Sequence, residues 1–194
     1  ETYAMDPAYA ENTRSLAAQL FEQTQELHQL EDRQRTLLEF AALVHDVGAY
    51  VNIRDRHKHT LYIIQSASLS GLTVREKEII ALVARYHRGK RPKKRDLKRL
   101  DAEGQRRLEL VAGMIAVADA LDRGRDGNVV DLQARLGDDT LVVQASTRGP
   151  AHLERWAVVQ RQERLERALQ RPLSVDIRPG LALSADDDPV ADDA

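Results

Sequence analysis

Apolar residues in the first 125 positions recur at the spacing of an α-helix. Leu16, Leu20 and Leu27 share one helical face, and Leu37 and Val44 repeat the same period in the next segment. The predicted helices cover residues 7–28, 37–47, 58–67, 73–87 and 103–122. This succession of amphipathic segments predicts an all-helical core over residues 1–125.

Two signals set the boundaries of the last predicted helices. The sequence Thr73-Val-Arg-Glu76 matches a capping box, in which the side chains of the first and fourth residues bind the free N–H groups at a helix start. The stretch 88–100 is rich in Lys and Arg and contains Pro92, so it is predicted to be a loop.

The period changes after residue 125. Val130, Leu132 and Leu136 alternate with polar residues, which predicts a strand, and a second strand is predicted from residue 141. A helix is predicted from Pro150 to Leu169, followed by a third strand over 173–177. The whole pattern predicts a mostly α fold, with a helical core and a small β-β-α-β segment over residues 126–180.

Composition narrows the class of protein. Cys is absent, which excludes disulfides, thiolate metal sites and cysteine nucleophiles. No apolar run is long enough to span a bilayer, and no leader sequence opens the chain, so a cytoplasmic location with no membrane partner is expected. Residues 181–194 hold five Asp and no Lys or Arg, and we expect a disordered acidic tail there.

Charge gives little support for nucleic-acid binding. Outside the tail there are 29 basic and 26 acidic residues, a net charge of about +3. That surplus is too small to indicate a nucleic-acid partner by itself. The basic loop also lacks interleaved aromatic residues, so nucleic acid is not expected as a partner.

The first candidate for chemistry is the His45-Asp46 pair at the end of a predicted apolar helix. Neighbouring helical residues point about 100° apart, yet both can reach one ion that lies against the helix end. The alternative is that His45 caps the helix C-terminus, where the helix dipole favours positive charge.

The second candidate is Asp119, the only charged residue in the apolar run 111–121. Burying a carboxylate is costly unless it is paired or bound to a metal. Arg123 and Arg125 are the partners that a buried salt bridge would use, so both interpretations stay open.

The third candidate is a set of histidines. His59 begins an apolar helix beside His57, and His87 follows the apolar face that ends at Val83. A single core-facing His is usually structural. Several His together with two Asp favour a divalent metal: imidazole and carboxylate suit Mn, Fe, Ni or Zn, and carboxylates also accept Mg.

The fourth candidate is a group of basic side chains flanking these histidines. Their position favours an anionic, phosphate-bearing ligand, whereas the alternative is an ordinary solvated loop. The predicted substrate-binding residues are Arg54, Arg56, Lys58, Arg88, Lys90 and Arg91.

These residues carry a resemblance. The chain closely resembles, over about residues 7–178, the C-terminal HD-type helical region of the exopolyphosphatase/guanosine-pentaphosphate phosphatase family. The matching stretches are Leu37-Leu-Glu-Phe-Ala-Ala-Leu-Val-His-Asp-Val-Gly48, His57-Lys-His-Thr-Leu-Tyr-Ile-Ile64, Gly71-Leu-Thr-Val-Arg-Glu76, Ile80-Ala-Leu-Val-Ala-Arg-Tyr-His-Arg88 and Val117-Ala-Asp-Ala-Leu-Asp-Arg123.

The resemblance implies a ligand set. In the wider HD superfamily the pattern His…His-Asp…Asp binds metal and hydrolyses phosphate esters. Carried over, His45, Asp46 and Asp119 are metal ligands, His59 and His87 match positions that hold a second ion, and Asp46 and His87 are the catalytic residues. The first His of the pattern falls about 36 residues before His45, where Tyr9 stands. A phenol keeps its proton at neutral pH and is a poor ligand. His28 is a substitute by chemistry but is not at the family position.

Two functions follow from this. The first is a metal-dependent phosphohydrolase acting on polyphosphate or a phosphorylated guanosine nucleotide, with a divalent ion as cofactor. The alternative is a non-catalytic module that binds polyphosphate or dimerises. In the family, phosphoanhydride cleavage belongs to actin-like domains, whose Gly-rich phosphate loops this chain lacks. An actin-like domain or protein is therefore an expected partner, and a homodimer is a further possibility.

Overall fold

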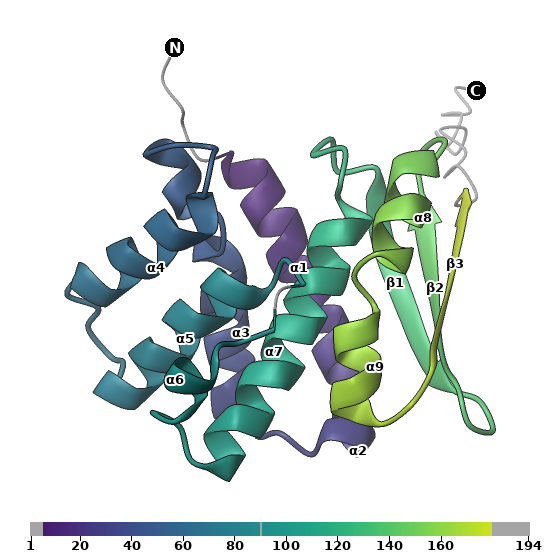
Figure 1. Ribbon diagram of the computed structural model, residues 1–194. Coiled ribbons are helices and arrows are strands. Elements are labelled where there is room, and N and C mark those ends of the chain that lie inside the picture. Colours follow the sequence, from purple (N-terminus) through teal and green to yellow (C-terminus); the bar gives the residue numbers. More distant parts are fainter. Residues whose placement is uncertain (1–5, 90, 180–194) are drawn as a thin grey trace, which may run out of the picture.

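The computed structural model describes residues 6–89 and 91–179 (Figure 1). The predicted acidic tail and Lys90 lie outside these residues. The helices are α1 (Pro7–Gln23), α2 (Gln25–His28), α3 (Asp32–Val44), the 3₁₀ helix η1 (Val47–Tyr50), α4 (Arg56–Ser66), α5 (Val74–Tyr86), α6 (Lys94–Leu97), α7 (Ala102–Leu121), α8 (His152–Val159) and α9 (Glu163–Leu169). The strands are β1 (Val129–Leu136), β2 (Leu141–Thr147) and β3 (Leu173–Pro179).

The mostly α prediction is confirmed, with local differences. The predicted capping box is present: the Thr73 hydroxyl accepts from the Glu76 N–H, and the Glu76 side chain accepts from the Thr73 N–H. The helix predicted over 7–28 is interrupted at Thr24, whose hydroxyl donates to the Leu20 carbonyl at 2.6 Å. That bond competes with the helical backbone. The predicted basic loop contains the single helical turn α6.

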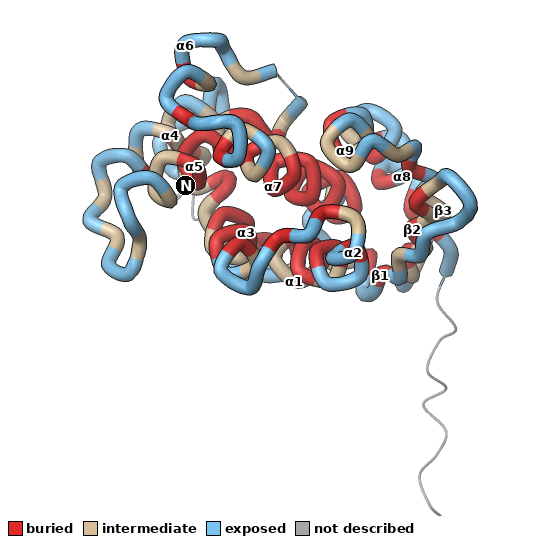
Figure 2. The backbone as a smooth tube through the Cα atoms, turned by 90° about the horizontal axis from the view of Figure 1, so that it is seen from below, coloured by how far each residue is buried: buried red, intermediate tan, exposed pale blue. Residues whose placement is uncertain are grey.

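Helix α7 is the centre of the molecule. Every residue from Leu110 to Leu121 is buried, and Figure 2 shows this helix as an almost continuous buried tube among its neighbours. A helix that is apolar on all sides is stable only when other elements surround it. Helices α1, α3 and α5 pack on it, as do α8 and α9. Asp119 lies in this apolar environment. The free-energy cost of burying its carboxylate therefore depends on its hydrogen-bond and ion-pair partners.

The C-terminal segment forms a three-stranded sheet in the order β1-β2-β3. Strands β1 and β2 form an antiparallel hairpin, whereas β2 and β3 are parallel and are joined by a helical crossover. The predicted single helix of this crossover is two helices, α8 and α9, with a turn at residues 160–162. One cluster of buried side chains includes Leu16 of α1, Leu165 of α9 and Ile177 of β3, so the helices and the sheet share a core.

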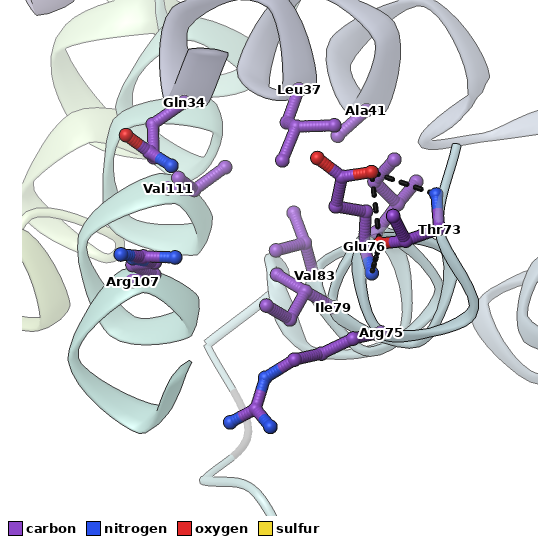
Figure 3. Close-up of a pocket in the computed structure, with 11 residues that line it drawn as sticks. Gln34, Leu37, Ala41, Thr73, Arg75, Glu76, Ile79, Val83, Arg107 and Val111 are labelled. Atoms are coloured by element: carbon purple, nitrogen blue, oxygen red, sulfur yellow. Dashed lines mark hydrogen bonds between the residues drawn. The ribbon is translucent and has the colours of Figure 1, made fainter. Parts of the chain in front are cut away.

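Three helices bring the candidate residues together by their C-terminal ends. His45 follows the last residue of α3, His87 follows the last residue of α5, and Asp119 lies two residues before the end of α7. Nearer their N-termini the same helices surround a cavity of about 200 Å³, lined by apolar side chains such as Leu37, Ile79 and Val111 (Figure 3). Of the helices in the described part of the chain, none has both the length and the apolar character that crossing a membrane requires.

Candidate metal centre

Two histidines cap their helices and meet at the same point. The Nδ1 atom of His45 lies 2.6 Å from the Ala42 carbonyl oxygen, and that of His87 lies 2.8 Å from the Ala84 carbonyl oxygen. A carbonyl only accepts, so both Nδ1 atoms carry the proton and donate it. The capping interpretation and the ligand interpretation are therefore compatible, because capping fixes each ring and leaves its Nε2 atom for a second partner.

Asp119 completes a cluster of three potential ligands. One ligand atom each from His45, His87 and Asp119 lies within 4.8 Å of the other two, and all three side chains are buried. The two imidazole rings stand edge to face with centroids 5.0 Å apart. The His45 Nε2 atom is 3.6 Å from Asp119 Oδ1, and Asp119 Oδ2 has no hydrogen-bond partner among the described residues. Two imidazoles and a carboxylate form a donor set suited to one divalent transition-metal ion.

Tyr9 closes this cluster on one side. It lies in the first turn of α1, which begins at an Asp6 cap whose carboxylate accepts from the Ala8 and Tyr9 N–H groups. Its hydroxyl lies 3.1 Å from His45 Nε2 and donates to Asp119 Oδ1. The hydroxyl therefore contacts two of the three potential ligands, and its proton is directed to Asp119.

Burial determines the charge of these groups. Burial, followed by the charge of Asp119, raises the pKa of Tyr9, so the phenol stays protonated. Burial lowers the pKa of His87 to about 3, so this imidazole is neutral at pH 7, the form that binds metal. Burial alone would raise the pKa of Asp119. The electrostatic influence of His45 and His87 and the hydrogen bond from the Tyr9 hydroxyl outweigh burial and hold that pKa below its usual range.

Asp46 faces arginines and not the cluster. Its Oδ1 atom lies 2.5 Å from Arg56 Nε, and its Oδ2 atom lies 2.7 Å from Arg125 Nη2. Arg125 has a left-handed backbone conformation, with φ of 61°, and its guanidinium lies 4.1 Å from the centre of the Tyr9 ring. The salt bridge considered for Asp119 thus forms at Asp46. At Asp119 itself, Arg161 Nη1 lies 4.0 Å from the Oδ2 atom.

Two further candidate histidines, His59 and His28, have different surroundings. His59 is half-buried on α4 and is not part of the three-residue cluster. His28 is fully buried, but its Nε2 atom donates to the Phe21 carbonyl at 2.9 Å and its Nδ1 atom accepts from the Leu30 N–H at 2.9 Å. It holds the turn after α2 and has no free nitrogen, so it does not replace the missing histidine.

The predicted substrate-binding residues lie in different places. Arg56 and Arg88 are half-buried near the cluster, whereas Arg54 and Lys58 are exposed and Lys58 pairs with Asp55. Arg91 is also exposed. It lines a separate cavity with side chains of α6, α7 and α9. Of the predicted substrate-binding residues that the structure describes, Arg56 and Arg88 lie close to the cluster.

A cavity of about 270 Å³ adjoins the cluster and is lined by His57, Arg85, Arg88 and Arg161. Burial lowers the pKa of Arg88, and the charges of Arg56 and Arg161 lower it further. Of the described atoms, Arg85 Nε and Arg161 Nη1 are buried without a hydrogen-bond partner. This cavity has a surplus of positive charge that an anion would offset. Sequence reasoning missed Arg85 and Arg161, because Arg85 lies inside a helix and Arg161 is 73 positions from Arg88 along the chain.

Comparison with known protein families shows to which family the chain belongs. Residues 1–165 match the family description "Ppx/GppA phosphatase, domain III". The chain belongs to the Ppx/GppA family. Its helical core and small sheet are therefore the structure of a Ppx/GppA C-terminal domain, as the resemblance of the motifs implied.

Three curated relatives carry the printed name guanosine-5'-triphosphate,3'-diphosphate pyrophosphatase. The proteins from Aeromonas hydrophila and Aeromonas salmonicida are each 31% identical over 80 residues, which is 41% of this chain and 16% of the relative. The protein from Vibrio parahaemolyticus is 31% identical over 87 residues, 44% of this chain and 18% of the relative. The chain thus aligns with less than a fifth of the length of these Ppx/GppA relatives.

Proposed function

We propose that this Ppx/GppA domain binds the phosphate chain of inorganic polyphosphate, or of a guanosine polyphosphate, in the arginine cavity. The observation that carries the proposal is the group of three guanidinium side chains, Arg85, Arg88 and Arg161, in one cavity beside the buried cluster. Guanidinium groups form paired hydrogen bonds with phosphate oxygens. A bound phosphate would offset the mutual repulsion that lowers the pKa of Arg88.

The closed cluster supports binding more than catalysis. Asp46, one of the two predicted catalytic residues, is held by Arg56 and Arg125. The Tyr9 hydroxyl takes up Asp119 Oδ1. Only three of the five predicted ligands meet among the described residues, so the donor set suits one ion and not two.

Calorimetric titration with tripolyphosphate tests the proposal. We expect saturable binding that weakens as salt rises, and a loss of affinity of about tenfold in Arg88→Gln and in Arg161→Gln. Arg171→Gln is the matched control, because Arg171 forms an exposed pair with Asp139. Equal affinity in all four proteins, each checked for a native circular dichroism spectrum, would overturn the proposal.

Metal-dependent phosphate hydrolysis is the second candidate, favoured by the convergence of His45, His87 and Asp119. The Nε2 atom of His87 and Asp119 Oδ2 are available for an ion, and His45 becomes available if the Tyr9 hydroxyl moves. A bound divalent ion supplies a Lewis acid for phosphate chemistry. The chain would contribute buried ligands, and Arg88 and Arg161 would hold the substrate phosphates.

Metal content and turnover test this candidate together. Purified protein is incubated with Mn²⁺, Zn²⁺, Mg²⁺, Ni²⁺ or Fe²⁺, desalted and measured by elemental analysis, then assayed for phosphate release from polyphosphate. Stoichiometric metal that is lost in His87→Ala, together with metal-dependent turnover, would support hydrolysis. Absence of metal with tripolyphosphate binding intact would leave the binding function alone.

The domain is also expected to work together with other parts of a longer protein. Because the curated relatives are several times longer than the aligned region, we propose that this domain works beside actin-like phosphatase domains. Cytoplasmic location and homodimerisation stay predictions. Sedimentation of the purified chain would test the second.

A further inference from the structure

A second groove, separate from the arginine cavity, combines apolar and basic side chains. It has a volume of about 440 Å³. Three segments that are far apart in the sequence form it: η1 through the first residue of α4, the turn after α7, and α8. Its lining residues are Ala49, Ile53, Arg56, Arg123, Arg125, Leu153 and Trp156.

The apolar wall of this groove is exposed. Trp156 is 61% exposed, Ile53 is 57% exposed and Leu153 is 48% exposed. Leu153 and Trp156 are three residues apart on α8 and so lie on the same face of that helix. An indole with two aliphatic neighbours forms a flat apolar surface of the kind on which an aromatic ring stacks.

The other wall carries uncompensated positive charge. Arg56 and Arg125 share the single carboxylate of Asp46. Arg123 has no ion pair with any residue that the structure describes, and the groove lining contains no Asp or Glu. The nearest acid on α8, Glu154, accepts a hydrogen bond from the Gly124 N–H. The groove therefore has about two positive charges more than it has negative ones.

This combination selects one class of ligand. An inorganic phosphate chain would leave the apolar wall unused, and a purely apolar ligand would cover three guanidinium groups without pairing them. We propose that the groove binds a nucleoside di- or triphosphate, with its base against Trp156 and its phosphates directed to Arg123 and Arg125. Stacking of a base on an aromatic side chain tolerates different bases, so the site is expected to accept both purines.

The chain provides its own reporter for this site. Trp156 is the only tryptophan, so tryptophan emission responds to this groove. Titration with GDP and with ADP is expected to quench the emission in a saturable way, whereas tripolyphosphate, which has no base to stack on Trp156, is expected to cause no quenching. Arg123→Gln is expected to weaken nucleotide binding about tenfold in the same assay, with Arg171→Gln as the unchanged control. Trp156→Leu, measured by calorimetry, is expected to weaken nucleotide binding as well.

The arms of this experiment separate the groove from the arginine cavity. Arg88→Gln is expected to lose tripolyphosphate affinity and to keep the nucleotide-induced quenching of Trp156, so either proposal can fail alone. Three results would overturn the nucleotide site: no saturable quenching, quenching by tripolyphosphate at the same concentrations, or unchanged nucleotide affinity in both Arg123→Gln and Trp156→Leu. Formation of a dimer that buries Trp156 and excludes GDP would also overturn it, in favour of a protein partner.

Discussion

The Tyr9 hydroxyl lies 3.1 Å from the Nε2 atom of His45, across 36 positions of sequence. The same hydroxyl donates to Asp119, so one phenol connects a residue that caps α3 to a carboxylate inside α7. This connection satisfies buried polar groups that would otherwise be costly. It also places a protonated phenol at the position where a metal ligand is expected. The contact that stabilises the helical core is therefore also the one that leaves the ligand set incomplete.

Replacing this phenol by imidazole is expected to create a stronger metal site. In Tyr9→His a third imidazole would join His45, His87 and Asp119, and the hydroxyl that occupies two of the ligands would be gone. We expect about one Mn²⁺ or Zn²⁺ per chain by elemental analysis after desalting, and less in the wild type.

Tyr9→Phe is the control for that experiment. It also removes the hydroxyl but adds no ligand, and it leaves His45 Nε2 and Asp119 Oδ1 with one partner fewer. Its free energy of unfolding is expected to fall by about 1–3 kcal/mol without metal. Equal metal content in Tyr9→His and Tyr9→Phe would contradict the assignment of this position.

The double ion pair of Asp46 is expected to stabilise the fold. Asp46→Asn leaves Arg56, whose side chain is only 11% exposed, without a carboxylate. Loss of an ion-pair partner is costly for the buried Arg56, whereas it costs less for the more exposed Arg125. Together we expect a decrease of about 2 kcal/mol in the free energy of unfolding. Urea denaturation measures it. Asp139→Asn, which breaks an exposed pair with Arg171, is the comparison and is expected to change little.

Much of the fold could be predicted from hydrophobic period alone. The apolar face of α5 and its Thr73 cap are local features, and local features are readable in sequence. The division of the predicted helix 150–169 into α8 and α9 could not be predicted from the sequence. The turn between them contains Arg161 and no Gly or Pro that would mark it. Packing of both short helices on α7 decides that break, and packing is a tertiary effect.

The site was predictable only in part, for geometric reasons. His45, His87 and Asp119 are each conspicuous at a helix end or in an apolar run, and the structure brings them together. Asp46 follows His45 directly, yet at the end of α3 it points toward Arg56 and Arg125. No local pattern encodes that direction, since it depends on arginines 10 and 79 positions away.

Gly48 is expected to tolerate no side chain. A Cβ atom there would lie 2.2 Å from the Arg56 carbonyl oxygen and 2.3 Å from the Thr60 nitrogen, both backbone atoms of α4. Gly48→Ala must therefore push η1 and α4 apart. We expect a loss of about 3 kcal/mol or more in the free energy of unfolding. Thermal unfolding checks it, with Gly71→Ala as the comparison. There a Cβ meets nothing within 4 Å, and only the left-handed backbone, at about 1 kcal/mol, opposes it. Similar losses in both variants would contradict the close approach.

Stability is expected to fall below pH 6.5, and part of the decrease belongs to His28. Burial lowers the pKa of His28 from its ordinary value of 6.5. Below pH 6.5 the unfolded chain therefore binds a proton at this side chain before the folded protein does. The folded state is thus favoured in full above pH 6.5, and the advantage declines as pH falls, by up to about 1.4 kcal/mol per pH unit. His87, with its pKa lowered to about 3, adds a decrease of the same sign.

In His28→Asn the amide oxygen can still accept from the Leu30 N–H, but nothing at this position titrates. Urea denaturation between pH 5 and pH 8 is therefore expected to show a shallower pH dependence for His28→Asn than for the wild type, and parallel curves would rule out a neutral buried His28.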